Sequence, residues 1–222
     1  MFALNRFALI PTRNRHQELI DVVHDIWRQV DRVYIIDNGS EPPVYFVKWP
    51  DESRIVIIRD SEQPPNLSRL WNLGLDQIAM VADSEHKVAV LNDDARVPAG
   101  WFDAVAEAMD STGAAAGCSS PWDGRLTQEI LKTQPDTDIM NRMFGPAFIV
   151  RGESMLRADE RLKWWWNDTD LDWKARSVGG MVVIPTHAVT NLYPNASTVG
   201  VNAEQAGRDR ETFREAWGWN PW

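Results

Sequence analysis

Short apolar runs alternate with segments of helical spacing over the first 115 residues, and this alternation constrains the fold most strongly. The predicted strands are 7–10, 33–36, 54–59 and 87–91. The predicted helices are 16–30, 66–82 and 100–109, with Asn14 as the candidate N-cap of the first. Strands and helices in alternation favour an α/β fold with a mainly parallel central sheet and helices on both faces.

The pattern weakens after Ala116. It still predicts a strand at 147–150, a helix opening after Asn167, a strand at 181–184 and a last helix at 203–217. Neither an internal repeat nor a low-complexity linker divides the chain. We therefore predict a single domain over 1–222, with a nucleotide-type half at 1–115 and a mixed half at 116–222 that closes over it.

Composition excludes several classes of protein. The 23 basic against 32 acidic residues give a net charge of −9, which disfavours binding to nucleic acid. A single cysteine, Cys118, can form neither an internal disulfide nor a multi-thiolate zinc site. Polar residues interrupt the N-terminus and no apolar run is long enough to span a membrane, so we expect a soluble, cytoplasmic protein.

The polar residues that follow the predicted strands are the candidate site. They are 12–15, 37–40, 59–60 and 92–94. Ligands of an open parallel sheet collect beyond the carboxyl ends of its strands, so three acidic clusters would meet in one cleft. Such a convergence favours a bound Mg²⁺ or Mn²⁺. The alternatives are purely structural: Asp93 and Asp94 would cap a turn, and Asp37 would form an Asx turn.

Missing motifs narrow the choice of nucleotide site. Residues 11–15 contain no glycine, which excludes a dinucleotide-binding turn. The sequence also lacks the glycine-lysine loop of P-loop nucleotide hydrolases and the GxSxG elbow of α/β-hydrolases. A nucleotide would have to be held without a glycine cradle.

Six segments together resemble the inverting GT-A glycosyltransferases of family 2, especially its small rhamnosyltransferase-like members. They are 10–15 (IPTRNR), 36–40 (IDNGS), 72–75 (NLGL), 90–95 (VLNDDA), 100–102 (GWF) and 167–171 (NDTDL). Each is weak alone, but their order and spacing are specific, and they cover most of the chain. The resemblance implies a GT-A fold whose first half binds a nucleotide sugar and whose second half, with its C-terminal helix, binds the acceptor.

The resemblance also implies roles for individual residues. The donor-binding residues would be Pro11, Thr12, Arg13, Arg15, Asp37, Asn38, Asn66, Arg69, Asn92 and Asp93. Asp94 would hold the metal on the diphosphate, and Asp168 would be the catalytic base unless it only caps its helix. Acceptor contacts would come from Trp165, Trp166 and Asp170. Asp168 and Asp170 point apart in a helix, so only one of them can face the sugar.

Four positions depart from the family pattern. Asn92 replaces a common aspartate, Asn167 a usual glutamate, Trp71 a frequent arginine and Asn191 a frequent histidine. His187 lies near Asn191, and a loop role is preferred for it over a metal ligand. With Trp71 in place of arginine, the candidate phosphate-side cations are Arg13, Arg15 and Arg69.

The expected function is a metal-dependent inverting glycosyltransferase that uses Mn²⁺ or Mg²⁺ and a UDP, dTDP or GDP sugar. The acceptor stays open, with a protein or glycan preferred. The alternative is a non-catalytic nucleotide-sugar or carbohydrate-binding module, which Asn92 and Asn167 would support. A nucleotidyltransferase would need a glycine-rich basic signature that the sequence lacks. The aromatic cluster of Trp217, Trp219 and Trp222 is a candidate docking tail or homodimer surface.

Overall fold

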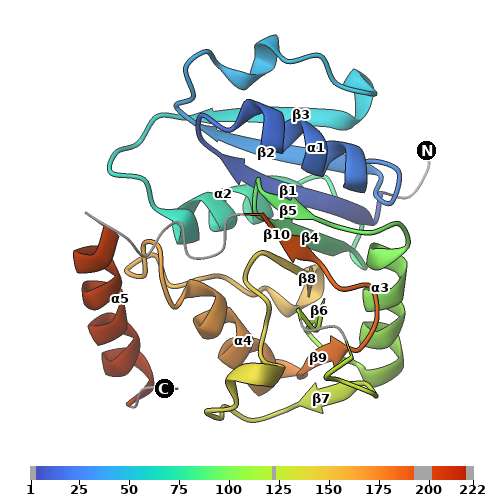
Figure 1. The fold of residues 1–222 in the computed structure, drawn as a ribbon, viewed down its shortest axis with the longest axis vertical. Helices are drawn as coiled ribbons and strands as arrows, with labels where there is room; N and C mark the ends of the chain where they lie inside the picture. The colour runs from blue at the N-terminus through green and yellow to red at the C-terminus, as the bar shows by residue number, and fades with distance from the viewer. Residues whose placement is uncertain (1–3, 122–123, 193–201, 219–222) are drawn as a thin grey trace.

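An eight-stranded, mostly parallel sheet runs through the molecule (Figure 1). The computed structural model describes residues 4–121, 124–192 and 202–218. The strands of the sheet, in spatial order, are β3 (Ile55–Asp60), β2 (Arg32–Asn38), β1 (Arg6–Thr12), β4 (Lys87–Leu91), β8 (Ala147–Arg151), β6 (Ala116–Ser119), β9 (Met181–Ile184) and β7 (Ile130–Lys132). Strands β8 and β7 run antiparallel to their neighbours, and the other pairs are parallel.

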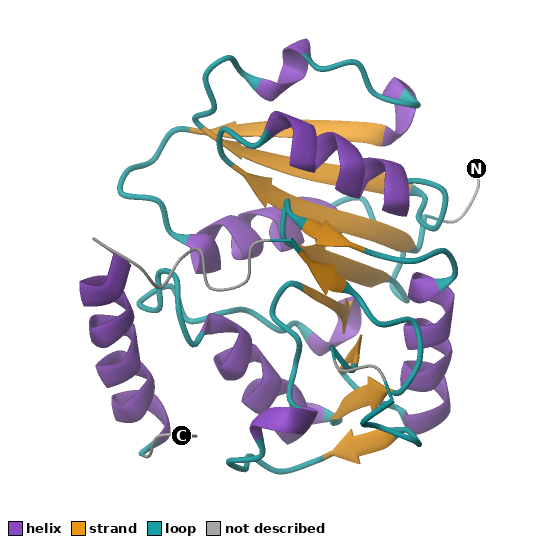
Figure 2. Ribbon diagram, in the orientation of Figure 1, coloured by secondary structure: helices purple, strands orange, loops and turns teal. Residues whose placement is uncertain are grey.

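Helices cover both faces of this sheet, as predicted (Figure 2). The helices are α1 (His16–Ile26), α2 (Leu67–Ala79), α3 (Trp101–Thr112), α4 (Asn167–Val178) and α5 (Asn202–Trp217). Along β1, Ala8 and Ile10 pack with α1 and α3, whereas Phe7 and Leu9 pack with α2 and α4. Successive side chains of a strand point to opposite faces, so one apolar run supplies both cores.

Helix α5 packs beside α4, away from the main sheet (Figure 1). Phe213 of α5 is fully buried against Trp166 and Trp173, with ring centroids 5.4 and 5.0 Å away. Trp217 donates its indole N–H to Asp170 Oδ1 at 3.0 Å, so it docks α5 onto its own chain. Trp219 and Trp222, the rest of the predicted aromatic tail, lie outside the described residues. In the described part of the chain, no helix has the length and apolar character needed to span a membrane.

Two sequence-based expectations about local structure need correction. Asn14 does not cap α1, because Arg15 holds the N-cap position and makes no capping bond with its side chain. Asn14 instead adopts a left-handed backbone with φ of 57°, and its side-chain oxygen accepts from the amide of Glu41. The sequence pattern also failed to predict β6, β7 and a two-stranded ribbon of β5 (Ala95–Arg96) and β10 (Thr190–Asn191), whose strands have only two residues each.

Candidate functional site

A cavity of about 860 Å³ lies at the carboxyl ends of β1, β2 and β4, a size suited to a nucleotide-sized ligand. Its other walls come from the 142–146 segment, from the approach to α4 and from the loop that ends in β10. The predicted site residues that line it are Pro11, Thr12, Arg13, Arg15, Asn38, Asn92, Asp93, Asp94, Trp165 and Asp168. Sheet topology therefore brings together most of the residues that the sequence singled out.

The acidic pair after β4 is held by groups from the end of β1. Arg15 Nη1 contacts Asp94 Oδ2 at 2.7 Å and Asp93 Oδ1 at 3.2 Å. The Thr12 hydroxyl donates to Asp93 Oδ2 at 2.8 Å. Burial raises the pKa of Asp93 to about 6, although Arg15 and Thr12 oppose the shift. Both residues of the pair line the ligand-sized cavity.

Asn191 lies beside Asp94 through the β5–β10 ribbon. Asn191 pairs with Ala95, and the amide of Leu192 donates to the Asp94 carbonyl at 3.2 Å. Asn191 lines the cavity, and its Oδ1 atom is buried and has no hydrogen-bond partner among the described residues. His187 is exposed and does not line the cavity, and its ring nitrogen Nδ1 contacts the Thr186 hydroxyl at 3.0 Å.

The oxygens around Asp94 fit a divalent cation held by few protein ligands. The described residues contain no cluster of three or more histidine, cysteine or carboxylate side chains suited to a metal. Asp94 and Asn191 nevertheless line the same cavity, and between them they carry a carboxylate, bonded to Arg15, and a buried amide oxygen without a partner among the described residues. Mg²⁺ in proteins is often held by one or two carboxylates, water and the phosphates of the substrate.

Asn38, rather than Asp37, faces the cavity at the end of β2. Asp37 is fully buried, and its carboxylate accepts from the amides of Ser40 at 2.8 Å and Val44 at 3.3 Å. The structure thus gives Asp37 the turn-forming contacts of the alternative interpretation. The side-chain N–H₂ of Asn38 donates to Asp60 Oδ2 at 2.5 Å. The side-chain oxygen of Asn38, Oδ1, is buried and has no partner among the described residues.

Two predicted donor-binding residues, Asn66 and Arg69, lie outside the cavity lining. Asn66 caps α2: its side-chain oxygen accepts from the amide of Arg69 at 3.1 Å. Arg69 pairs with Asp60 at 2.6 Å and with Glu62 at 3.2 Å. Arg69 lies behind Asn38, because the Asp60 carboxylate accepts hydrogen bonds from both Asn38 and Arg69.

Asp168 projects into the cavity from the first turn of α4. Trp166, not Asp168, holds the N-cap position, so the capping alternative does not describe Asp168. Its Oδ1 accepts from the amide of Thr169 at 2.8 Å, whereas Oδ2 has no hydrogen-bond partner among the described residues. Gly145 packs directly against this carboxylate.

Asp170 and Trp166, two of the predicted acceptor residues, do not line the main cavity. Asp170 is 1% exposed, and its carboxylate accepts from Lys174 at 2.6 Å and from Trp217 at 3.0 Å. Trp166 is 8% exposed and packs on Phe213. These contacts anchor α5, whereas Asp168 and Trp165 remain on the cavity.

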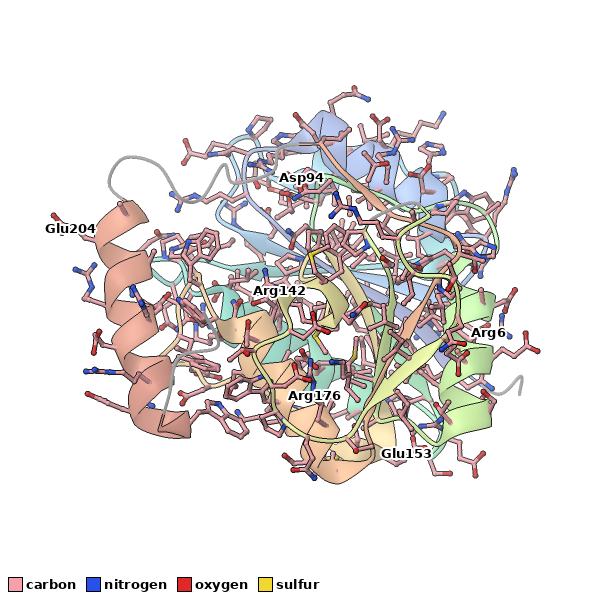
Figure 3. All side chains as sticks on the ribbon, turned by 60° about the horizontal axis from the view of Figure 1, so that its bottom comes forward. Arg6, Asp94, Arg142, Glu153, Arg176 and Glu204 are labelled. Carbon is pink, nitrogen blue, oxygen red and sulfur yellow. The ribbon has the colours of Figure 1, made fainter. Side chains whose placement is uncertain are left out.

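The 142–146 segment contributes lining residues that no sequence motif marked. The amide of Asn92 donates to the Pro146 carbonyl at 2.9 Å, which ties this segment to the acidic strand end. The buried Asp172 of α4 accepts from the amide of Met143 at 3.2 Å. Arg142, from the same segment, lies between Asp94 and Arg176 in Figure 3. A segment fixed from both sides presents Arg142 and Gly145 to the site.

The model of glycosyl transferase family 2 matches residues 7–170 of the 222. The chain belongs to this family. The family 2 assignment confirms the resemblance found in the sequence, and a comparison with curated protein sequences finds no match.

Solved structures similar to this chain include the GT-A glycosyltransferases TarS and GalNAc-T7. The crystal structure of S. aureus TarS residues 1–349 matches with a TM-score of 0.62 and 11% identity, over 97% of this chain and 72% of that one. GalNAc-T7 with UDP, GalNAc and Mn²⁺ matches with a TM-score of 0.65 and 12% identity, over 97% of this chain and 49% of that one. A TarS complex with UDP-GlcNAc matches with a TM-score of 0.60 and 11% identity, over 98% of this chain and 74% of that one. At these identities the likeness establishes the GT-A fold of this family 2 member.

Proposed function

We propose that this family 2 glycosyltransferase transfers a sugar from a nucleoside-diphosphate donor to an acceptor hydroxyl, with inversion at the anomeric carbon and with a divalent cation. One observation carries the proposal. The carboxylate of Asp168 and the Asp93–Asp94–Arg15 group line the same cavity of about 860 Å³. A transferase needs these two functions, a proton acceptor and a holder of the leaving diphosphate, within reach of one substrate.

The donor nucleotide is assigned to the ends of β1 and β2. The unpaired Oδ1 of Asn38 can accept an N–H from the edge of a base such as uracil. Arg13 and Arg15 line the cavity and supply positive charge for the phosphates. UDP-sugars are the first donors to test, because TarS and GalNAc-T7 were solved with UDP or UDP-GlcNAc.

The cation is assigned to Asp94 and Asn191, with Asn92 beside them on the cavity. When bound, it would neutralise charge that develops on the departing diphosphate. In the structure Arg15 already bonds Asp94, so the cation must share or replace that contact. GalNAc-T7, solved with Mn²⁺, makes Mn²⁺ the first ion to test and Mg²⁺ the second.

Asp168 is assigned as the base. Its free Oδ2 would accept the proton of the acceptor hydroxyl while that oxygen attacks the anomeric carbon from the face opposite the diphosphate. Thr169 orients the carboxylate through the 2.8 Å bond from its amide. Trp164 and Trp165 line the cavity next to Asp168 and offer indole faces to sugar C–H groups.

The direct test is a panel of UDP, dTDP and GDP sugars with Mn²⁺ or Mg²⁺ and candidate glycan acceptors. Release of free nucleoside diphosphate reports transfer or donor hydrolysis, and NMR of the product reports the anomeric configuration. We expect release with at least one donor and an inverted product. Donor binding without any turnover, in calorimetry, would instead favour the non-catalytic binding module.

A further inference from the structure

A second cavity, of about 350 Å³, lies against Asp168 and extends to α5. It is lined by Arg142, Trp165, Trp166, Asp168, Thr169, Ala206, Gly207 and Arg210. Arg142, Trp165 and Asp168 also line the main cavity, so the two cavities meet at the proposed base. If the donor fills the main cavity, the second one opens a separate approach to the same carboxylate.

The α5 wall of this second cavity is firmly fixed. Asp209 is fully buried, and its Oδ2 accepts from the amides of Trp164 at 2.8 Å and Trp165 at 2.9 Å. Phe213 and Trp217 complete the attachment through the aromatic cluster and the bond to Asp170. The outer face of α5 carries Glu204, which points away from the protein (Figure 3). The cavity is therefore a built feature between α4 and α5.

The charged side chains that line this cavity are mainly positive, whereas the whole chain has a negative net charge. Two guanidinium groups, Arg142 and Arg210, line it against the single carboxylate of Asp168, on a protein with a net charge of −9. Trp165 and Trp166 add aromatic surface. Guanidinium groups bind carboxylates and phosphates through charge-assisted bonds, and indoles pack on sugar rings.

We propose that the second cavity is the acceptor site, and that the acceptor is a sugar carrying an anionic group, a carboxylate or a phosphate. Its reacting hydroxyl would meet Asp168, while Arg142 and Arg210 hold the anionic group. This inference rests on the proposed function for the identity of the ligand as an acceptor. The expectation of an anionic group on the ligand rests on the two arginines. The expectation of a sugar rests on the aromatic walls.

Calorimetry with three small sugars tests the proposal: glucose, glucuronate and glucose 6-phosphate. Saturating UDP is present, so that the phosphate-side arginines of the main cavity are occupied. We expect one or both charged sugars to bind at least about 10-fold more tightly than glucose, because each would gain a charged hydrogen bond. The two charged sugars distinguish a carboxylate acceptor from a phosphate acceptor.

Gly207 lines the second cavity, so a larger side chain at this position tests whether the cavity is the binding site. A Cβ at this position would meet nothing within 4 Å, so Gly207→Leu adds bulk without a clash in the helix. Gly207→Leu and Arg210→Gln should both abolish the preference for charged sugars. Arg208→Gln is the matched control, because Arg208 lies on α5 outside the cavity lining and bonds Gln205.

Equal affinity for charged and neutral sugars, or no detectable binding of either charged sugar, would overturn the proposal. A charged-sugar preference that survives in both Gly207→Leu and Arg210→Gln would also overturn it. UDP binding is measured separately. If UDP fails to bind while the charged sugar binds and depends on Gly207 and Arg210, the anion site stands and the proposed transferase function fails.

Discussion

Gly145 has no side chain where Asp168 needs room: a Cβ on Gly145 would lie 2.5 Å from Asp168 Oδ2. Contact at that distance is not sterically allowed, so one of the two residues would have to move. The same carboxylate oxygen is the one left without a hydrogen-bond partner among the described residues. The absence of a side chain at Gly145 therefore sets the position of the proposed base.

The substitution Gly145→Ala should displace the Asp168 carboxylate. We expect kcat to fall by roughly 10- to 100-fold, because small misplacement of a reacting group is costly. UDP affinity should change much less. Steady-state kinetics and UDP calorimetry check this, and unchanged thermal unfolding excludes a folding defect. Full activity in Gly145→Ala would show that the carboxylate does not need its present position.

Removing the Asp209 carboxylate should loosen the segment that leads to Asp168. In Asp209→Ala the amides of Trp164 and Trp165 lose their acceptor. We expect the free energy of unfolding to fall by about 1–3 kcal/mol. Hydrogen exchange should rise in α5 and at 164–168. Asp209→Asn keeps an oxygen acceptor, so its hydrogen exchange should lie between that of the unmodified protein and that of Asp209→Ala. Equal exchange in the unmodified protein and in both variants would contradict the anchoring role of Asp209.

Arg176 should be a large contributor to stability. It contacts Asp172 at 2.7 Å and Asp136 at 3.0 Å, and Asp172 is 1% exposed. Arg176→Met would leave Asp172 buried without its cation, which should cost about 3–5 kcal/mol in denaturant unfolding. Arg214→Met is the matched control, because the Arg214–Glu211 pair is exposed. That control should change stability by less than about 1 kcal/mol.

Cys118 should be unreactive in the folded protein. Burial raises its pKa from 9.0 to about 12, so the reactive thiolate is scarce at pH 8. The rate at which Cys118 is alkylated should therefore be limited by the rate at which the protein unfolds. Because the folded state holds this proton more tightly, the free energy of unfolding should fall as pH rises above 9. Cys118→Ala should lack this part of the pH dependence, and rapid native-state alkylation would contradict the burial.

Much of the fold could be predicted from the first 115 residues. Strong apolar periods there mark β1 to β4 and α1 to α3 within a few residues. Strand β6 escaped prediction because its sequence, Ala116–Ser119, contains small residues and a glycine. Gly117 belongs there for tertiary reasons: an added Cβ would lie 2.9 Å from both Met109 and Val105 of α3. Packing across the fold, not local pattern, defines this strand.

The candidate site could be located from sequence, but the direction of its side chains could not. Neighbouring residues at a strand end point to different sides, so Asn38 reaches the cavity while Asp37 does not. For Asp168 and Asp170 the sequence predicted that only one could face the site, and the structure places Asp168 on the cavity. Arg142 was missed because it comes from a loop without a motif and reaches the site only through tertiary folding. The roles of the gathered residues remain predictions.

The central claim is that Asp168 takes the proton while Asp94 holds the cation and the diphosphate. The most direct measurement compares kcat and UDP affinity in Asp168→Asn and Asp94→Asn. We expect Asp168→Asn to lower kcat by roughly 10²- to 10⁴-fold with nearly unchanged UDP affinity. Asp94→Asn should weaken metal-dependent UDP binding as well as kcat. Turnover in Asp168→Asn equal to that of the unmodified protein, with normal unfolding in both, would contradict the account.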